Sequence, residues 1–501
     1  MFKRALFFIS IIVAFLIIVK PIIEGNIPFW YDPARDLLMA WDHLGKPTLI
    51  GPTSGIPGIF YGPHWIWLLS IGIAISKDPR FIVFLILTLP YFILLPLSIM
   101  KLRGKLVDLK TMMSIWILSI FVLGNYANQI WSPNLAPLLF FSLLTLLYLT
   151  PNALEKINTI RFFLMGLIQG LLLQHQISFG VALTVGWIFY FICLLVQIVF
   201  DKKNRNKFFT HWIINAGSFA SGFMVMQAPF FLFEIRHGFM QTKSLFFTLN
   251  QSIAHNSPVV GQVGLTKIEI IQKFFDRGAI ALSLPTQFAL GVSMLLAFFI
   301  IRNLMKRKVY EHNDKNLLLF LCTVIGGLFF VYLGTRNPVW NYHFIAVEIV
   351  FIFLIMLVVK KNKLLGSLLF IWAIILFFVN SVSFVKSFTV QAHTSELTAK
   401  KATVVFIFDD SKDTPFAYFG KNPAIYTYDY DYLFRWVGEM KKIHPASDSN
   451  MVKNIYLIIP DEMKFDKVGF TENRTPSSKY KTEQEWVRED KTIVIKRVRI
   501  D

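Results

Sequence analysis

The residues best suited to chemistry lie in one short segment, FWYDPARD at positions 29–36. It brings two carboxylates, Asp32 and Asp36, and the guanidinium of Arg35 within five residues. If a helix begins at Pro33, Asp32 is its N-cap residue and Asp36 follows one turn later on the same side. Both acids would then face one cavity, where a carboxylate can take the proton of an attacking hydroxyl. The alternative is that Asp32 only caps the helix and Asp36 pairs with Arg35 or another neighbour.

A connector rich in glycine and proline follows at 51–65 and leads into a short apolar run with two tryptophans, 64–76. The run is too short to cross a bilayer, so we expect a helix lying at the membrane interface. Such a connector can fold over a site and offer backbone N–H groups to an anion. Tyr61 and His64 are therefore candidate cavity-lining residues. The alternative is an ordinary loop rich in turns.

Several basic residues are candidates for binding a phosphate, because they stand near the ends of apolar runs or beside the acidic pair. These residues are Arg35, Arg236, His237, Lys243, Arg336 and His343. A guanidinium matches phosphate oxygens with two parallel hydrogen bonds. The alternative is that these side chains reach out of the membrane to lipid head groups.

Two further residues, His175 and Tyr342, are candidate cavity-lining groups near the predicted outer ends of spans. Polar side chains inside membranes usually face the protein interior. For His175, which stands between Gln174 and Gln176, the alternative is a hydrogen bond between helices.

Together, the acidic pair, the connector and the aromatic helix resemble the polyprenyl-phosphate-sugar-dependent glycosyltransferases of the C-type fold. That group includes protein O-mannosyltransferases and aminoarabinose transferases. Asp32 matches the first acid of the family's Asp-Glu signature and Arg35 matches its arginine, whereas Pro33 stands where the family often has Glu and Asp36 stands near its usual tyrosine. The resemblance implies inverting transfer of a sugar from a polyprenyl phosphate to a lipid, glycan or protein on the outer face. Asp32 would be the base, with Asp36 as its partner or replacement.

Other known signatures are absent from the sequence or weak. It contains no Walker loop, no Gly-x-Gly-x-x-Gly and no Gly-x-Ser-x-Gly. Asp429 and Asp431 form an Asp-x-Asp pair at the start of a predicted helix, where capping is the expected role. Cys193 and Cys322 lie in apolar runs, which favours neither a disulfide nor a metal site. We predict no nucleotide cofactor, and the sequence leaves a metal requirement open.

Composition places these residues in a membrane protein. The 501 residues are 55% hydrophobic and only 16% charged, against about 25% charged in soluble domains. A span needs about 20 mostly apolar residues, and the pattern predicts an all-α polytopic membrane protein with eleven spans. They are 5–23, 81–100, 111–124, 133–149, 162–177, 179–200, 210–231, 285–301, 316–333, 342–359 and 364–385, the long run 162–200 being divided near His175.

Basic residues predict the direction of the spans. One set of short loops holds 20 Lys and Arg residues, and the short loops of the other set hold only Arg336. Because basic loops remain cytoplasmic, we expect a cell-membrane protein with a cytoplasmic N-terminus. This distribution also explains the net charge of +19 without a nucleic-acid partner.

The predicted organisation is a membrane domain, 1–385, with outer loops 24–80 and 232–284, followed by an outer α/β domain, 386–501. Within this second domain, the predicted strands are Thr403–Phe408, Asn454–Ile459 and Thr492–Val498, and the predicted helix is Tyr430–Ile443. A transporter or a lipid-linked glycan ligase is the alternative function. Charged groups at the membrane midplane are typical of transporters, whereas these spans are almost free of charge.

The predicted topology can be tested at Ser447, which lies in the outer domain. A cysteine introduced by Ser447→Cys should react with a membrane-impermeant thiol reagent in intact cells. Protection of this position until the cells are lysed would contradict the topology.

Overall fold

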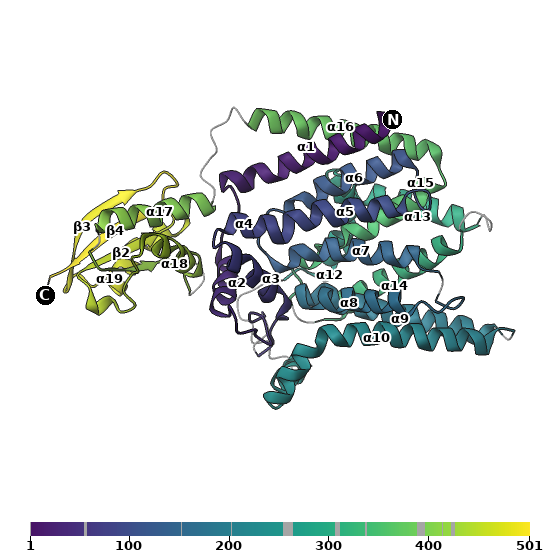
Figure 1. The fold of residues 1–501 in the computed structure, drawn as a ribbon, viewed down its shortest axis with the longest axis horizontal. Coiled ribbons are helices and arrows are strands. Elements are labelled where there is room, and N and C mark those ends of the chain that lie inside the picture. Colours follow the sequence, from purple (N-terminus) through teal and green to yellow (C-terminus); the bar gives the residue numbers. More distant parts are fainter. Residues whose placement is uncertain are drawn as a thin grey trace.

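A computed structural model of the chain describes most of its residues. The described ranges are 2–54, 58–151, 153–201, 203–253, 264–305, 311–335, 338–387, 396–412, 414–421 and 426–500. They form a long helical bundle with a small mixed domain, here called the tail domain, at one end (Figure 1).

The bundle helices follow the predicted spans closely. In chain order they are α1 (Phe2–Glu24), α4 (Pro79–Val83) continued by η1 (Phe84–Thr88) and α5 (Leu89–Leu102), α6 (Leu109–Leu123), η3 (Ser132–Leu135) continued by α7 (Ala136–Leu149), α8 (Thr159–His175), α9 (Ile177–Phe200), α10 (Arg205–Arg236), η4 (Thr286–Phe288) continued by α13 (Ala289–Met305), α14 (His312–Gly334), η5 (Asn341–Phe344) leading to α15 (Glu348–Lys360), and α16 (Lys363–Ser387). The predicted break near His175 is confirmed, because Gln176 leaves helical geometry between α8 and α9.

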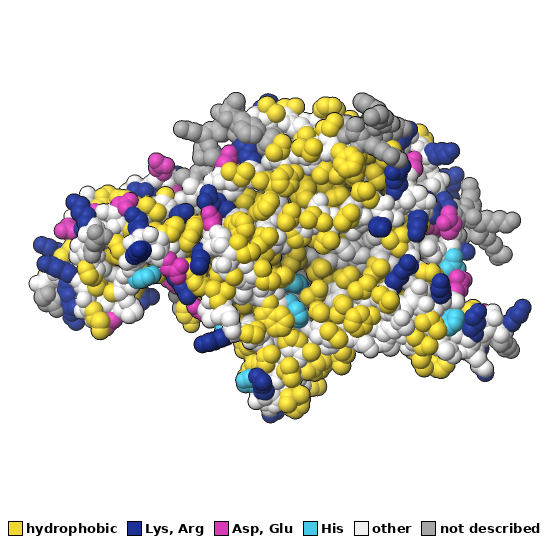
Figure 2. Space-filling model, viewed as in Figure 1, with side chains coloured by type: hydrophobic (Ala, Val, Ile, Leu, Met, Phe, Trp, Pro, Cys, Tyr) yellow, Lys and Arg dark blue, Asp and Glu magenta, His cyan; other side chains and the backbone are white. Residues whose placement is uncertain are grey.

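Length and composition separate these helices into two groups. In the described part of the chain, nine helical segments are long and apolar enough to cross a membrane. The other two predicted spans are shorter helices, α6 with 15 residues and α8 with 17. Hydrophobic side chains cover the middle of the bundle, and Lys and Arg gather at its two ends (Figure 2). The chain is thus a multi-pass membrane protein.

The two predicted outer loops contain short helices. The first loop forms α2 (Tyr31–Asp42) and α3 (His64–Ile75), and the second forms α11 (Met240–Ile253) and α12 (Lys267–Ala281). In α2, the buried residues recur every three or four positions, at Ala34, Leu37 and Ala40, with Trp41 beside the last. This spacing gives the helix one face to bury.

The tail domain has a four-stranded sheet with two longer helices. Its elements are α17 (Glu396–Ser411), β1 (Phe416–Gly420), α18 (Tyr428–Lys441), β2 (Asn454–Ile459), α19 (Lys467–Arg474), β3 (Tyr480–Val487) and β4 (Ile493–Arg499). The strand order is β1-β2-β4-β3, with β1 and β2 parallel and the other pairs antiparallel. Two predicted strands and the predicted helix are confirmed at β2, β4 and α18.

The predicted strand Thr403–Phe408 is wrong, because these residues belong to α17. Their β-branched and aromatic side chains suit a strand. In the fold, however, Leu397, Val404 and Ile407 are buried at helical spacing.

The tail domain and the first loop share a hydrophobic core. Tyr432 of α18 is fully buried and packs its ring 5.7 Å from that of Phe29 and 5.6 Å from that of Trp41. Its hydroxyl donates a hydrogen bond to the carbonyl oxygen of Lys77 at 2.6 Å. Lys400 of α17 donates another to the carbonyl oxygen of Phe29 at 2.9 Å. These contacts hold α2 between the bundle and the tail domain.

Candidate active site

Helix α2 carries both carboxylates of the acidic segment. It begins at Tyr31, and its N-cap residue, Trp30, makes no side-chain capping bond. The prediction that Asp32 caps a helix beginning at Pro33 is therefore wrong. Tyr31, the residue ahead of Asp32, joins the helix, so Asp32 lies in its first turn. An acid there still interacts favourably with the helix dipole.

Arg35 lies between the two acids and bonds both. Its Nη1 is 3.0 Å from Oδ1 of Asp32, and its Nη2 is 2.8 Å from Oδ1 of Asp36. Its Nε also donates to Oδ1 of Asp36 at 2.9 Å. The predicted pairing of Asp36 with Arg35 is thus observed, and Asp32 shares the same guanidinium.

The two carboxylates differ in exposure. The Asp36 side chain is 3% exposed, whereas that of Asp32 is 35% exposed. Asp36 also accepts a hydrogen bond from Nε1 of Trp65 at 2.9 Å through its second oxygen. Burial raises the pKa of Asp36 to about 6, although Arg35 acts to lower it. Asp36 is therefore the enclosed partner, and Asp32 is the acid that solvent or a ligand can reach.

The predicted cavity-lining residues Tyr61 and His64 lie at the end of the connector and at the start of α3. Burial raises the pKa of Tyr61, and the nearby Tyr342 hydroxyl and Asp32 carboxylate raise it further. Nδ1 of His64 is hydrogen-bonded to Oε1 of Gln174, while burial lowers the pKa of the imidazole. A side-chain carbon at Gly62 would lie 1.9 Å from the same Gln174 oxygen, so this close approach of loop and helix needs glycine.

Aromatic rings join the first loop to the bundle. The ring of Trp131 lies 6.2 Å from that of Trp30 and 5.4 Å from that of Tyr342. Tyr342 is further fixed because Nε2 of Gln176 donates to its carbonyl oxygen at 2.9 Å. These ring contacts place Tyr342, a predicted cavity-lining residue from the second half of the chain, near the acidic pair.

His175 is enclosed beside the site. It is 1% exposed, and its ring lies 5.9 Å from that of Trp65, the residue that bonds Asp36. Its Nδ1 has no hydrogen-bond partner among the described residues. The alternative in which this nitrogen bonds a neighbouring helix is therefore not observed.

The remaining basic candidates have different surroundings. His343 is buried, and its Nδ1 accepts a hydrogen bond from the backbone of Trp340 at 3.2 Å, which is a structural contact. His237 stacks on Phe233 at 4.1 Å. Arg236 and Lys243 are exposed, and the described residues offer Arg236 no hydrogen-bond or ion-pair partner. Arg336 lies outside the described residues.

The elbow between α10 and α11, which carries Arg236 and His237, is connected to the site. Glu234 accepts hydrogen bonds from the backbone of Gln241 and Thr242, both at 2.9 Å, at the start of α11. The Gln241 side chain in turn accepts a hydrogen bond from the backbone of Phe60 at 2.9 Å. The elbow therefore packs against the residue that precedes Tyr61.

A buried ion pair that we did not predict supports the same region. Nη1 of Arg277 in α12 lies 2.6 Å from Oε1 of Glu348, which also accepts a hydrogen bond from the Tyr126 hydroxyl at 3.0 Å. Nη2 of Arg277 donates to the carbonyl oxygen of Asn341 at 3.0 Å, next to Tyr342. Glu348 is the single carboxylate within the eleven predicted spans, and an acid in such a position usually has a role.

The Asp-x-Asp pair in the tail domain makes internal contacts. The predicted capping role is wrong, because α18 has Thr427 as its N-cap residue with no side-chain capping bond. Asp429 bonds Lys400 at 2.7 Å, and Asp431 accepts a hydrogen bond from the Tyr418 hydroxyl at 2.6 Å. In the described part of the chain, no group of three or more His, Cys, Asp or Glu residues could hold a metal ion.

No family model and no curated protein sequence matches the chain. Its fold, however, is similar to that of ArnT from Cupriavidus metallidurans. The apo crystal structure of ArnT has a TM-score of 0.57 and 10% identity, covering 98% of this chain and 97% of that chain. The structure bound to undecaprenyl phosphate has a TM-score of 0.50, with the same identity and coverage. ArnT is an aminoarabinose transferase of the C-type glycosyltransferase fold, and this chain shares that fold.

Proposed function

We propose that the protein is an inverting glycosyltransferase that moves a sugar from a polyprenyl phosphate to an acceptor on the outer face of the membrane. The fold supports this proposal, because ArnT has a structure bound to undecaprenyl phosphate. The observation that carries it is the Asp32–Arg35–Asp36 arrangement in the first loop, where one acid is exposed and the other is enclosed.

The exposed acid, Asp32, is the catalytic base in this proposal. The acceptor hydroxyl oxygen attacks the anomeric carbon while Asp32 takes its proton. The bond between the sugar and phosphate oxygen breaks, and its electron pair leaves with the polyprenyl phosphate. Of the two Asp32 oxygens, Oδ1 bonds Arg35, and Oδ2 is the oxygen that can receive the proton.

The enclosed acid, Asp36, is a positioning residue. One of its oxygens accepts from Arg35 on the same helix, and the other accepts from Trp65 of α3, which joins α2 to α3. It therefore orients Arg35, and Arg35 in turn fixes the direction of the Asp32 carboxylate.

The leaving phosphate needs positive charge rather than an acid. The guanidinium of Arg35 is already shared by two carboxylates. Arg236 is exposed on the elbow that packs against the Tyr61 loop, so we assign it to the donor phosphate. Arg336 remains a second predicted contact.

The reaction itself can be tested with purified protein and a panel of undecaprenyl phosphate sugars. A transferase releases lipid phosphate and passes the sugar to an acceptor or to water. A transporter would move a solute and leave the lipid-linked sugar intact, an outcome that contradicts the proposal.

The first prediction concerns Asp32. The Asp32→Asn variant is nearly isosteric and cannot accept the proton, so kcat should fall by about 10² to 10⁴ while donor binding persists. Asp42→Asn, at the other end of α2, is the matched control and should remain active, since its exposed pair with Arg435 contributes little. If Asp32→Asn were nearly as active as the parent and Asp36→Asn were inactive, the base would instead be Asp36.

The second prediction concerns pH. Burial holds the pKa of Asp36 at about 6, so below about pH 6 the carboxylate is protonated and its charge pair with Arg35 is lost. We therefore expect kcat/KM to fall as the pH is lowered through 6. In Asp36→Asn, this dependence should be absent and the activity lower throughout.

Stability should change in the opposite direction. Because the pKa of Asp36 is raised in the folded protein, the folded state binds this proton more readily than the unfolded chain does. The contribution of Asp36 to stability therefore increases as the pH falls from about 6, the pKa of Asp36 in the folded protein, to about 4, the ordinary pKa of an aspartate. If the parent and the Asp36→Asn variant showed the same pH dependence of kcat/KM, and also the same pH dependence of Tm, this role of Asp36 would be contradicted.

The third prediction separates phosphate binding from membrane anchoring. Arg236 and Arg205 are basic residues at opposite ends of α10. The loss of a charged hydrogen bond costs about 1.5–3 kcal/mol, so Arg236→Ala should lower kcat/KM for the donor by about 10- to 150-fold. Arg205→Ala should not lower it. Equal effects of the two substitutions would show that Arg236 only anchors the helix.

A further inference from the structure

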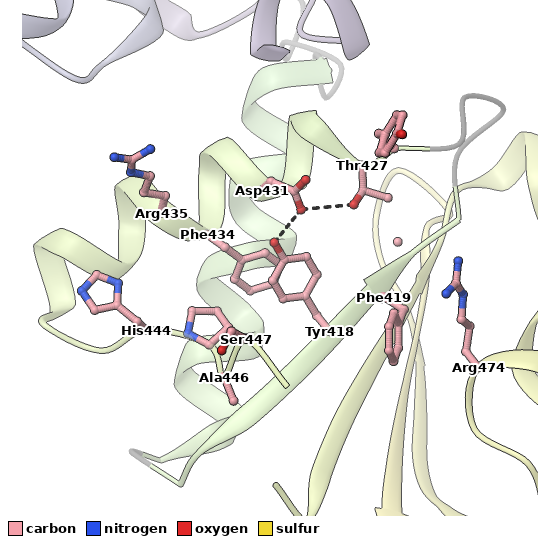
Figure 3. Close-up of a pocket in the computed structure, with 13 residues that line it drawn as sticks. Tyr418, Phe419, Thr427, Asp431, Phe434, Arg435, His444, Ala446, Ser447 and Arg474 are labelled. Carbon is pink, nitrogen blue, oxygen red and sulfur yellow. Dashed lines mark hydrogen bonds between the residues drawn. The ribbon is translucent and has the colours of Figure 1, made fainter. Parts of the chain in front are cut away.

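The tail domain contains a pocket of about 440 Å³ that the reaction above does not use. It lies beside β1, the N-terminal half of α18 and the segment 444–447 (Figure 3). β1 is an edge strand, because its ladder partner in the sheet is β2 alone. Pockets of this size, with aromatic walls and a few polar groups, are typical of small-molecule sites.

Aromatic side chains form much of its wall. The rings of Tyr418 and Phe434 are stacked at 3.8 Å in the centre of the view in Figure 3. Tyr426 also lines the pocket and is 56% exposed. Such rings can pack against the C–H faces of a sugar.

The charges in the pocket favour an anion. Asp431 is the one acid in its lining, and its Oδ1 accepts hydrogen bonds from Tyr418 and Thr427. On the basic side, Arg474 is exposed and has no ion-pair partner among the described residues, while His444 is also exposed. Figure 3 shows these two side chains on opposite sides of the stacked rings. A guanidinium binds carboxylate or phosphate oxygens with good geometry.

A ladder of tyrosines connects this pocket to the catalytic segment. Tyr426 stacks on Tyr428 at 5.3 Å, and Tyr428 lies 5.0 Å from Tyr31. The Arg35 guanidinium lies 5.6 Å from the centre of the Tyr31 ring, and Asp32 is the next residue. Arg435, another lining residue, pairs with Asp42 of α2 at 2.5 Å. Because Tyr432 of the same helix, α18, is buried against Phe29 and Trp41, the pocket is fixed relative to α2.

From this arrangement we infer that the pocket binds an acidic saccharide, one that bears carboxylate or phosphate groups, as part of the acceptor. This inference rests on the proposed glycosyl transfer. Arg474 holds the anionic group, and a neighbouring sugar unit extends along the tyrosine ladder toward Asp32.

Binding can be measured directly on the full-length protein in detergent by calorimetry. Trigalacturonate supplies carboxylates, glucose 6-phosphate supplies a phosphate, and maltotriose is the neutral control. We expect saturable binding of at least one of the two anionic probes, about tenfold or more tighter than that of maltotriose. The probe that binds identifies the anionic group.

Variants locate this binding in the pocket. Arg474→Ala removes the guanidinium, which lies 5.1 Å from the centre of the Phe419 ring, and Ser447→Trp fills the pocket from its exposed rim. Each should weaken binding of the anionic probe about tenfold or more. Lys481→Ala removes an exposed cation from β3, outside the pocket, and should leave binding unchanged. Unchanged melting temperatures would show that the variants are folded.

The outcomes separate this inference from the proposed function. Binding should persist in Asp32→Asn, since that residue is needed for transfer and not for holding the anionic unit. Equal affinity for maltotriose, no binding of either anionic probe, or binding unchanged in both Arg474→Ala and Ser447→Trp would overturn the inference. None of these results would alter a measured release of lipid phosphate, which tests the transferase proposal by itself.

Discussion

The arrangement of the site depends on one buried contact, the Asp36 carboxylate held between Arg35 and Trp65. Burying a carboxylate is costly unless its oxygens are paired, and here α2 and α3 each supply a partner. The same contact turns the guanidinium of Arg35 toward Asp32. Removing one partner would leave a buried charge with an open bond, so the helices α2 and α3 are constrained to remain together.

The tail domain is the second constraint on α2. Tyr432, packed between Phe29 and Trp41, is part of a core that the tail domain and the first loop share. Large-to-small changes at such aromatic positions typically cost about 3–5 kcal/mol. The tail domain, although predicted as a separate unit from its composition, thus contributes to the rigidity of the segment that carries Asp32 and Arg35.

The sequence was most informative where composition and short-range spacing decide the structure. Long apolar runs predicted the spans, and the acidic segment pointed to Asp32, Arg35 and Asp36 because its residues are neighbours in the chain. Pairings between distant segments were missed, as with Arg277 and Glu348, which are 71 positions apart. The strand predicted at Thr403–Phe408 failed because packing against α18 and the first loop overrides a local β preference.

The unequal exposure of Asp32 and Asp36 also suits a site at a membrane surface. A base must reach water or an acceptor, whereas the group that orients it must be kept from water, because an enclosed charge pair is weakly screened by salt. Two acids one turn apart on α2 meet both needs. The buried face of the helix, formed by Ala34, Leu37 and Ala40, includes Asp36, whereas Asp32 lies near the start of the helix and is more exposed. Moving either acid by one residue would rotate it about 100° around the helix. The spacing of the acidic segment is therefore as important as its composition, because it decides that Asp36 is enclosed and Asp32 is exposed.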